Sequence, residues 1–307
     1  MTESRRGLLL GVAAYSIWGL FPLYWPLLEP AGAVEILAHR MMWSLVTMGV
    51  LVIVLGRTAA FRRVVSEGRV ARLLALAAVL ITVNWAVYIW GVNNGHVVET
   101  ALGYFINPLV TVLMGVFILG ERLRRWQWAA MAVAGLAVVV LTVDYGRLPW
   151  VALILALTFG SYGLCKKQAN APAIESITFE TMLVGPLALG YVVWLASHGD
   201  SNFGNHGLGH ALLFMTTGIV TAVPLICFGG AAIRVPMVTL GLLQYLTPTL
   251  QFILGVAYFH EDMPTGRWIG FVLVWIALAM FTYDLMRTRR REVQVRVPVP
   301  TATTPCP

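Results

Sequence analysis

The sequence lacks the charge that the surface of a water-soluble protein needs. Only 11% of its 307 residues are charged and 59% are hydrophobic, whereas roughly 25% of residues are charged in ordinary soluble domains. The mean hydropathy is +0.79. These values exclude an ordinary soluble domain and indicate an integral membrane protein.

Cysteine is also scarce. The chain has three cysteines, Cys165, Cys227 and Cys306, and no two of them have the CxxC spacing. This pattern suggests neither a disulfide framework nor a metal site. We therefore expect no metal and no cofactor.

Sequence signatures of common enzymes are absent as well. The chain has no GxGxxG opening a helix after a strand, no GxxxxGKS or GxxxxGKT, no HExxH and no GxSxG. We expect neither an enzyme nor a pump driven by ATP on this chain alone. The net charge of +7 could suggest nucleic acid, but the basic residues fall in short loops, where membrane topology explains them better.

Long apolar segments make up most of the chain. Each is close to the roughly 20 residues that a helix needs to cross the hydrocarbon core of a bilayer. The segments are continuous rather than alternating, which disfavours a transmembrane barrel. The sequence predicts an all-α integral membrane protein with ten transmembrane helices, at about residues 7–28, 34–55, 72–91, 100–120, 127–144, 149–166, 177–196, 210–230, 238–259 and 268–286.

The basic residues are distributed unevenly between the two sides that this topology creates. If the N-terminus lies inside, all of the 21 Lys and Arg residues except Arg40, Arg147 and Arg267 fall in the cytoplasm or at its edge. Basic side chains resist translocation, so this asymmetry predicts a multi-pass protein with both termini in the cytoplasm. Residues 288–307 are predicted to form a disordered basic tail near anionic lipid.

The chain contains a long internal repeat. A shift of 140 residues aligns the second half on the first without a gap from about Ala31 to Asp144. The matched residues include Glu35 with Glu175, Glu121 with Glu261, Pro108 with Pro248 and Trp128 with Trp268. Chance alignment of apolar residues is the alternative. Residues 1–145 and 146–287 would each hold five spans, and an odd number places the two repeats in opposite orientations.

Polar side chains form two stripes that the same shift relates. They flank the paired prolines, and a proline inside a span frees a carbonyl group that a cavity can satisfy but lipid cannot. The stripes predict the walls of a central polar path for a solute, to which Asn84 and Tyr88 of the third span could also contribute. Hydrogen bonds that serve only helix packing are the alternative. The stripes consist of Tyr104, Asn107 and Thr111 in the first half and Gln244, Thr247 and Gln251 in the second.

Charged residues lie inside two predicted spans. The shift places Arg40 opposite Glu180, and the sequence predicts Glu35, His39, Arg40 and Glu180 as gating or proton-linked groups. Glu35 and His39 are four residues apart and could pair on one helix face, which would make His39 a proton carrier. A structural pair at the helix end is the alternative. For Arg40 the alternative is that its long side chain reaches the interface.

Several segments resemble the RarD-type permeases, the chloramphenicol-sensitivity group in the EamA branch of the drug/metabolite transporter superfamily. The resemblance runs from about Gly7 to Asp284 and rests on GVAAYSIWGLFPLYW, EILAHRMMWS, NWAVYIWGVNNGHVVETALGYFINPLV, GERLRRWQW and GLLQYLTPTLQFILGV. It implies two EamA domains, ten transmembrane helices, an inner (plasma) membrane location and transport of small solutes or drugs, with export as the expected direction. It implies no catalytic residue.

Taken together, these patterns predict a secondary-active carrier that works by alternating access. Protons are a candidate coupling ion. A membrane scaffold or assembly protein, which would use the polar stripes for packing, and a passive channel stay open as alternatives.

Overall fold

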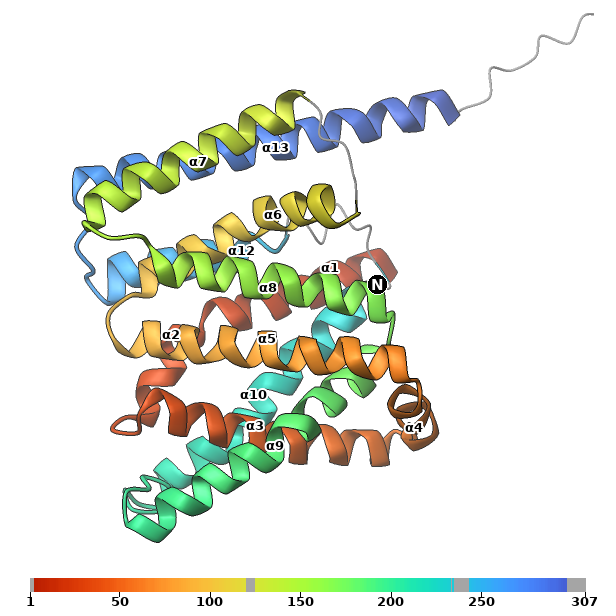
Figure 1. Ribbon diagram of the computed structural model, residues 1–307, viewed down its shortest axis with the longest axis vertical. Helices are drawn as coiled ribbons and strands as arrows, with labels where there is room; N and C mark the ends of the chain where they lie inside the picture. Colours follow the sequence, from red (N-terminus) through yellow and green to blue (C-terminus); the bar gives the residue numbers. More distant parts are fainter. Residues whose placement is uncertain (1–2, 120–124, 233, 235–242, 297–307) are drawn as a thin grey trace, which may run out of the picture.

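The computed structural model describes residues 3–119, 125–232, 234 and 243–296, and in these ranges every regular element is a helix (Figure 1). In chain order the elements are α1 (Glu3–Gly19), α2 (Phe21–Tyr24), η1 (Trp25–Leu28), α3 (Ala33–Val54), α4 (Thr58–Ser66), α5 (Gly68–Asn93), α6 (Val97–Leu119), α7 (Arg125–Tyr145), α8 (Trp150–Ala169), α9 (Ala173–His198), α10 (Leu208–Ala232), α12 (Leu246–Ile253), η2 (Leu254–Tyr258) and α13 (Thr265–Arg296).

Within the described ranges, six helices are long and apolar enough to cross a membrane, namely α3, α5, α7, α9, α10 and α13. A seventh span results if α1 and the segment Phe21–Leu28, which is bent by 45° relative to it, count as one. Shorter apolar helices cover Val97–Val110, Trp150–Lys166 and Leu246–Tyr258. The chain is therefore an all-helical, multi-pass membrane protein, while the number of ten crossings stays a prediction.

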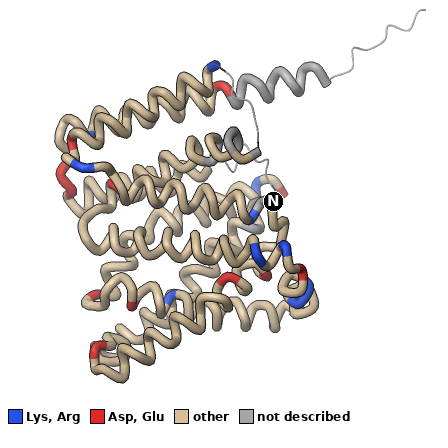
Figure 2. The backbone as a smooth tube through the Cα atoms, in the orientation of Figure 1, with Lys and Arg blue, Asp and Glu red and all other residues tan. Residues whose placement is uncertain are grey.

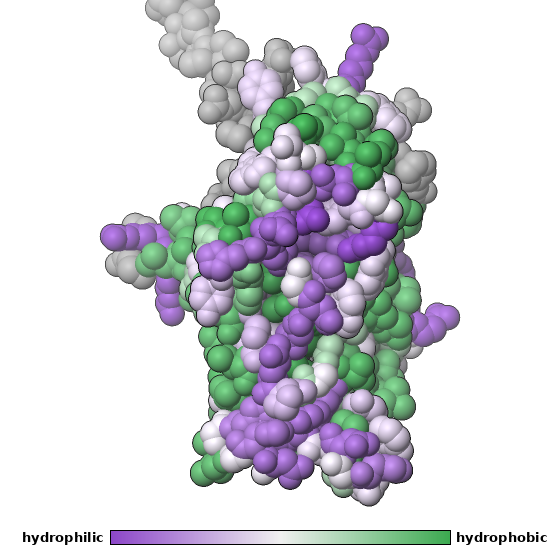
Figure 3. Space-filling view, turned by 90° about the vertical axis from the view of Figure 1, so that its left-hand side faces the viewer, coloured by the Kyte–Doolittle hydropathy of each residue, from purple (hydrophilic) through white to green (hydrophobic). Residues whose placement is uncertain are grey.

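The helices form a bundle whose two ends differ in charge. The described N-terminus and the end of α13 lie at one end of the bundle (Figure 1), and Lys and Arg gather near that end, notably around α4 (Figure 2). Hydrophilic residues run down the middle of the opposite end, with hydrophobic residues on both flanks (Figure 3). Large apolar side chains are exposed along the bundle, among them Val54, Val143 and Leu187, as contact with lipid tails requires.

The helix contacts occur in related pairs. α1 packs on α10 and α12, whereas α8 packs on α5 and α6; α10 packs on α3, whereas α5 packs on α9. Three further contacts join α3 to α9, α6 to α12 and α7 to α13. The shift of 140 residues matches α3 with α9, α5 with α10, α6 with α12 and α7 with α13, and α1 and α8 are the first helices of the two halves. This correspondence exchanges the two members of each related pair of contacts, and it converts each of the three further contacts into itself.

Close approach of α3 and α10 depends on Gly218. A Cβ atom at this position would collide with the carbonyl oxygen of Trp43 and with Thr47 Oγ1. Gly49 of α3 is different, because nothing lies within 4 Å of the position where its Cβ atom would stand. The two glycines thus offer a matched pair of substitutions, one inside the contact of α3 with α10 and one in open space on α3.

Gly218→Ala is expected to lower the free energy of unfolding by about 2 kcal/mol, because α3 and α10 must move apart. Gly49→Ala is expected to raise it by up to about 1 kcal/mol, since alanine restricts the unfolded chain and favours the helix. Unfolding by SDS in mixed micelles measures both. A stabilised Gly218→Ala variant would show that the two helices are not in tight contact.

The C-terminal helix is longer than predicted. α13 continues to Arg296, so the prediction of a disordered tail from residue 288 is wrong for residues 288–296. Continuation of the helix satisfies the backbone groups internally, which the basic composition alone does not reveal. Residues 297–307 lie outside the described part of the chain.

Candidate functional site

Four of the predicted path residues come together inside the bundle. Asn84 on α5 donates from Nδ2 to Leu155 O at 3.0 Å and to Thr158 Oγ1 at 2.9 Å, and its Oδ1 accepts from the Tyr104 hydroxyl at 3.2 Å. The rings of Tyr104 and Tyr88 pack edge to face with centroids 5.7 Å apart. The Tyr88 hydroxyl in turn accepts from Gln251 Nε2 at 2.9 Å. These contacts connect α5 and α6 of the first half to α8 and α12 of the second half.

The remaining stripe residues lie around this group. Thr247 donates to Tyr15 O at 2.8 Å, and Gln251 also donates to Trp18 O at 3.2 Å, so both attach α12 to α1. Asn107 is buried on α6, and Gln244 is half-buried just before α12. The side chain of Thr111 lies outside the described part. The hydrogen bonds of Asn84 and Thr247 to neighbouring helices are the contacts that the packing interpretation describes.

Arg40 of α3 lies near Tyr88 and Tyr104 of this group. Its side chain does not reach the interface, because the residue is only 2% exposed. The guanidinium carbon lies 3.8 Å from the centroid of the Trp85 ring and 4.9 Å from that of Trp25, and Nε donates to Thr221 Oγ1 at 3.1 Å. The alternative of a snorkelling arginine is therefore wrong, since these rings and the hydroxyl hold the guanidinium inside. We call Arg40, Asn84, Tyr88, Tyr104 and Gln251 the central cluster.

His39 and Glu35 do not form the predicted pair. Glu35 instead accepts from the backbone N–H of Asn202 at 2.7 Å, from Asn202 Nδ2 at 2.7 Å and from Ser201 Oγ at 3.4 Å. The His39 ring packs between Phe203 and Phe214, and neither ring nitrogen has a hydrogen-bond partner among the described residues. The prediction is wrong because the loop after α9 supplies the carboxylate with several donors at once.

The two glutamates that the repeat matches hold corresponding loops. Glu35, in the first turn of α3, binds the loop between α9 and α10. Glu175, in the first turn of α9, lies 2.6 Å from Arg57 Nε in the loop after α3, as an ion pair without hydrogen-bond geometry. Each therefore ties the start of its own helix to the other half of the chain.

Glu180, which the repeat matches with Arg40, lies in an ion pair. Its Oε1 is 2.6 Å from Lys166 Nζ, and its Oε2 accepts from the Tyr162 hydroxyl at 3.2 Å. Lys166 also donates to Ser176 Oγ. The two positions that the sequence shift matches therefore have different partners: Glu180 binds to α8, whereas Arg40 has aromatic partners.

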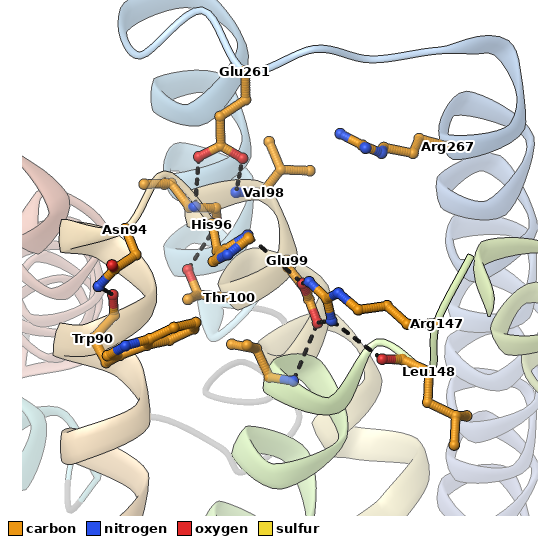
Figure 4. Close-up of polar contacts among 12 residues, drawn as sticks. Trp90, Asn94, His96, Val98, Glu99, Thr100, Arg147, Leu148, Glu261 and Arg267 are labelled. Atoms are coloured by element: carbon orange, nitrogen blue, oxygen red, sulfur yellow. Dashed lines mark hydrogen bonds and ion pairs between the residues drawn. The ribbon is translucent and has the colours of Figure 1, made fainter. Parts of the chain in front are cut away.

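A second polar group (Figure 4) lies where α6 and α13 begin, at the end of the bundle opposite the N-terminus (Figure 1). Glu261, in the loop before α13, accepts from the backbone N–H of Val97 at 2.5 Å and of Val98 at 3.0 Å, at the start of α6. This position favours a carboxylate, because the helix dipole and free N–H groups both face it. The contact ties the second half of the chain to the first.

Glu99 continues this group toward α8. It is 1% exposed and accepts from Arg147 Nη2 at 2.8 Å, from Arg147 Nη1 at 3.3 Å and from the Val151 N–H at 3.1 Å (Figure 4). We call Glu99, Arg147 and Glu261, with the backbone N–H groups they bind, the polar latch. Sequence reasoning assigned no role to Glu99 or Arg147. The sequence did offer one indication, because Glu99 and Arg147 both lie at ends of predicted spans on the side of the membrane away from the termini.

The surroundings of the latch change the acidity of its groups. Burial raises the pKa of Glu261 to about 7, although the N–H groups of Val98 and Val97 and the charge of Arg267 act in the opposite direction. Burial lowers the pKa of His96, whose Nδ1 is 3.9 Å from Glu99 Oε2, and Glu99 opposes this shift. No group of three or more His, Cys, Asp or Glu side chains in the described ranges could hold a metal ion.

Glu261→Gln is expected to remove a pH dependence of stability between pH 4.5 and about 7. The folded chain has the higher pKa, so as the pH rises the unfolded chain loses its proton first. The stabilising contribution is complete below pH 4.5 and is lost as the pH rises through about 7, and we expect it to be about 2 kcal/mol after allowance for solvent access. SDS unfolding at about pH 5 and pH 8 measures it, with the exposed Glu67→Gln as control. An unchanged pH slope in Glu261→Gln would contradict the assignment.

Comparison with known proteins places this geometry in a family. The profile described as "EamA-like transporter family" matches residues 5–143 and 148–283. "Protein RarD" of Streptomyces exfoliatus is 57% identical over 290 residues, which cover 94% of this chain and 92% of that protein. "Protein RarD" of Escherichia coli K12 is 41% identical, with coverages of 94% and 98%.

An "Uncharacterized transporter" of Pseudomonas aeruginosa is 44% identical over 94% of this chain and 96% of that protein. One solved crystal structure has the same fold, with a TM-score of 0.60 at 18% identity over 92% of this chain and 98% of that one. The matches to the family profile and to the RarD proteins cover nearly all of the sequence. The chain belongs to the EamA-like transporter family and is a RarD-type permease of the drug/metabolite transporter superfamily.

Proposed function

We propose that this membrane transporter is a secondary-active carrier that moves a small solute by alternating access, with export as its direction. The solute would contact the central cluster and the stripe residues Asn107, Thr111, Gln244 and Thr247. The observation that carries the proposal is the central cluster itself, in which buried polar side chains from both halves meet between apolar helices.

Unsatisfied atoms favour a solute path over packing alone. Arg40 Nη1 and Gln251 Oε1 are buried and have no hydrogen-bond partner among the described residues. A buried polar atom without a partner costs about 1–3 kcal/mol, and polar networks that serve only packing are normally satisfied. A solute or its water shell would supply the partners that the chain does not.

The related helix contacts and the polar latch support alternating access. We infer two inverted repeats of five spans, residues 1–145 and 146–287, because exchanging the matched helices reproduces the same set of major helix contacts. The latch joins Glu261 of the second repeat to α6 of the first, so opening that end requires these bonds to break. Its location at the less basic end fits the periplasmic face of an inner membrane, with both termini in the cytoplasm.

In this proposal Glu35 and Glu180 act as gating groups, and the charged residues do not form a chain for proton transfer. Glu35 and Glu180 hold helix and loop ends together across helix contacts, which suits groups whose bonds change when the carrier opens. Among the described residues, the ring contacts of His39 are with the apolar rings of Phe203 and Phe214. We keep protons as the candidate coupling ion, with Glu261 at the latch as the group that titrates near neutral pH.

Purified protein in liposomes under an imposed pH gradient tests the proposal. Pools of radiolabelled amino acids, nucleosides and sugars, together with chloramphenicol, serve as probes, and empty liposomes serve as the control. We expect flux of a member of one pool that saturates with concentration. Folded protein without flux of any probe would favour a membrane scaffold, and conductance in planar bilayers would favour a channel.

A further inference from the structure

Arg40 differs from every other basic side chain that the structure describes. It is the only Lys or Arg in the described part whose side chain is buried. The partly buried ones each have a carboxylate partner: Arg57 with Glu175, Arg147 with Glu99, Lys166 with Glu180, Arg234 with Glu3 and Arg267 with Asp144. Arg40, the most buried of them, has no carboxylate partner among the described residues.

The partners that Arg40 does have are neutral. The guanidinium carbon lies over the Trp85 ring, and it is 4.9 Å from the centroid of the Trp25 ring and 5.7 Å from that of the Phe21 ring. The Thr221 hydroxyl accepts a hydrogen bond from Nε. Tyr104, Tyr88 and Tyr24 also lie near the guanidinium. Aromatic rings stabilise a cation only in part, and a buried charge normally requires an opposite charge beside it.

From this contrast we infer that Arg40 binds the anionic group of the transported solute, and that the solute is a small monocarboxylate with an aromatic or other apolar body. The inference rests on the proposed function. Nη1 is buried without a described partner, and the planar guanidinium matches a carboxylate in two parallel hydrogen bonds. The Trp and Phe rings around Arg40 would contact the apolar body.

Conversely, the same arrangement disfavours neutral and cationic solutes. A neutral amide can accept only through its single oxygen and leaves the guanidinium charge without compensation. A cation would be repelled by Arg40 and would find no described carboxylate beside it. A site built to bind a charged group discriminates strongly against the analogue that lacks it.

Ligand-induced stabilisation of the purified full chain in lipid nanodiscs tests this. The probes are phenylacetate with phenylacetamide and indole-3-acetate with indole-3-acetamide, which differ within each pair mainly in charge. Binding to the folded state raises the unfolding midpoint by mass action. We expect at least one carboxylate to raise the midpoint, and its amide to bind at least tenfold more weakly or not at all.

Arg40→Gln is expected to remove the difference between acid and amide, and Arg40→Lys to retain part of it. The exposed Arg72→Gln serves as the matched control and should behave as the native chain. If Arg40→Gln does not fold, Arg40→Lys and Thr221→Val are used in its place. We expect each of them to bind the carboxylate probe several-fold more weakly than the native chain does. Equal binding of acid and amide in both pairs, or full binding in the folded Arg40 variants, overturns the inference.

Flux measurements separate this inference from the proposed function. Carboxylates that bind through Arg40 but do not cross liposomes would disprove transport and leave the anion site intact. Chloramphenicol or another neutral probe that crosses equally fast in native and Arg40→Gln liposomes would disprove the anion site and leave transport intact.

Discussion

Gln251→Leu is expected to lower the flux of the transported solute at least tenfold while the chain still folds. Gln251 donates to the Tyr88 hydroxyl at 2.9 Å and to Trp18 O at 3.2 Å, and its Oε1 has no partner among the described residues. Leucine has a similar volume but no polar atom, so it removes the bond that joins α12 to α5 in the central cluster. A loss of about 1.4 kcal/mol in stabilisation of the transport step corresponds to a tenfold slower rate.

The control for Gln251→Leu lies two residues away on the same helix. Thr249 is exposed and its hydroxyl bonds only to Tyr245 O within its own turn, so Thr249→Val should leave flux unchanged. Initial rates in liposomes, normalised to the amount of folded protein, measure both variants. A poorly folded Gln251→Leu variant with normal flux per folded molecule would assign Gln251 to packing.

Lys166→Met is expected to lower the free energy of unfolding by about 3 kcal/mol at neutral pH. Glu180 is a buried carboxylate whose hydrogen-bond partners among the described residues are Lys166 and the Tyr162 hydroxyl. The substitution removes the first of these and leaves the second. Removal of one member of a buried ion pair costs more than the pair contributes, because the other charge stays buried. SDS unfolding in mixed micelles at pH about 7 measures the loss.

The double variant Lys166→Met with Glu180→Gln separates the two effects. It carries no buried charge at this position, so we expect it to recover most of the lost stability. A double variant as unstable as Lys166→Met alone would show that the packing of the lysine stem, and not its charge, carries the effect. Flux of the double variant then reports whether Glu180 acts in gating.

Helices could be predicted from the sequence because their cause is local. Apolar segments of about 20 residues must satisfy their backbone groups internally in a membrane, and only a helix does so within one segment. Each of the ten predicted segments accordingly overlaps a described helix. The end of α13 was misplaced, since the boundary of a helix beyond the membrane depends on weak local preferences.

The central cluster could be predicted only in outline. Tyr104 and Gln251 stood out because polar side chains inside a span need partners, and the structure brings both to the same cluster through Tyr88 and Asn84. Arg40 stood out for the same reason, but its burial among aromatic rings was not evident, because Trp85 and Trp25 are distant in sequence. Glu35 and His39 were paired wrongly, since spacing along one helix says nothing about loop 199–207 of the other half.

By itself, the sequence determined that this protein is a helical membrane protein of the EamA-like transporter family with an internal repeat. Those properties depend on composition, on segment length and on matches along the chain, all of which are present in one dimension. Only the tertiary structure decided which charges have partners: Glu180 with Lys166, Glu35 with Asn202, Glu261 with the start of α6, and Arg40 with aromatic rings and no acid among the described residues. The reason is physical, because the free energy of a buried charge depends on groups within a few ångströms, and packing of distant helices brings those groups together.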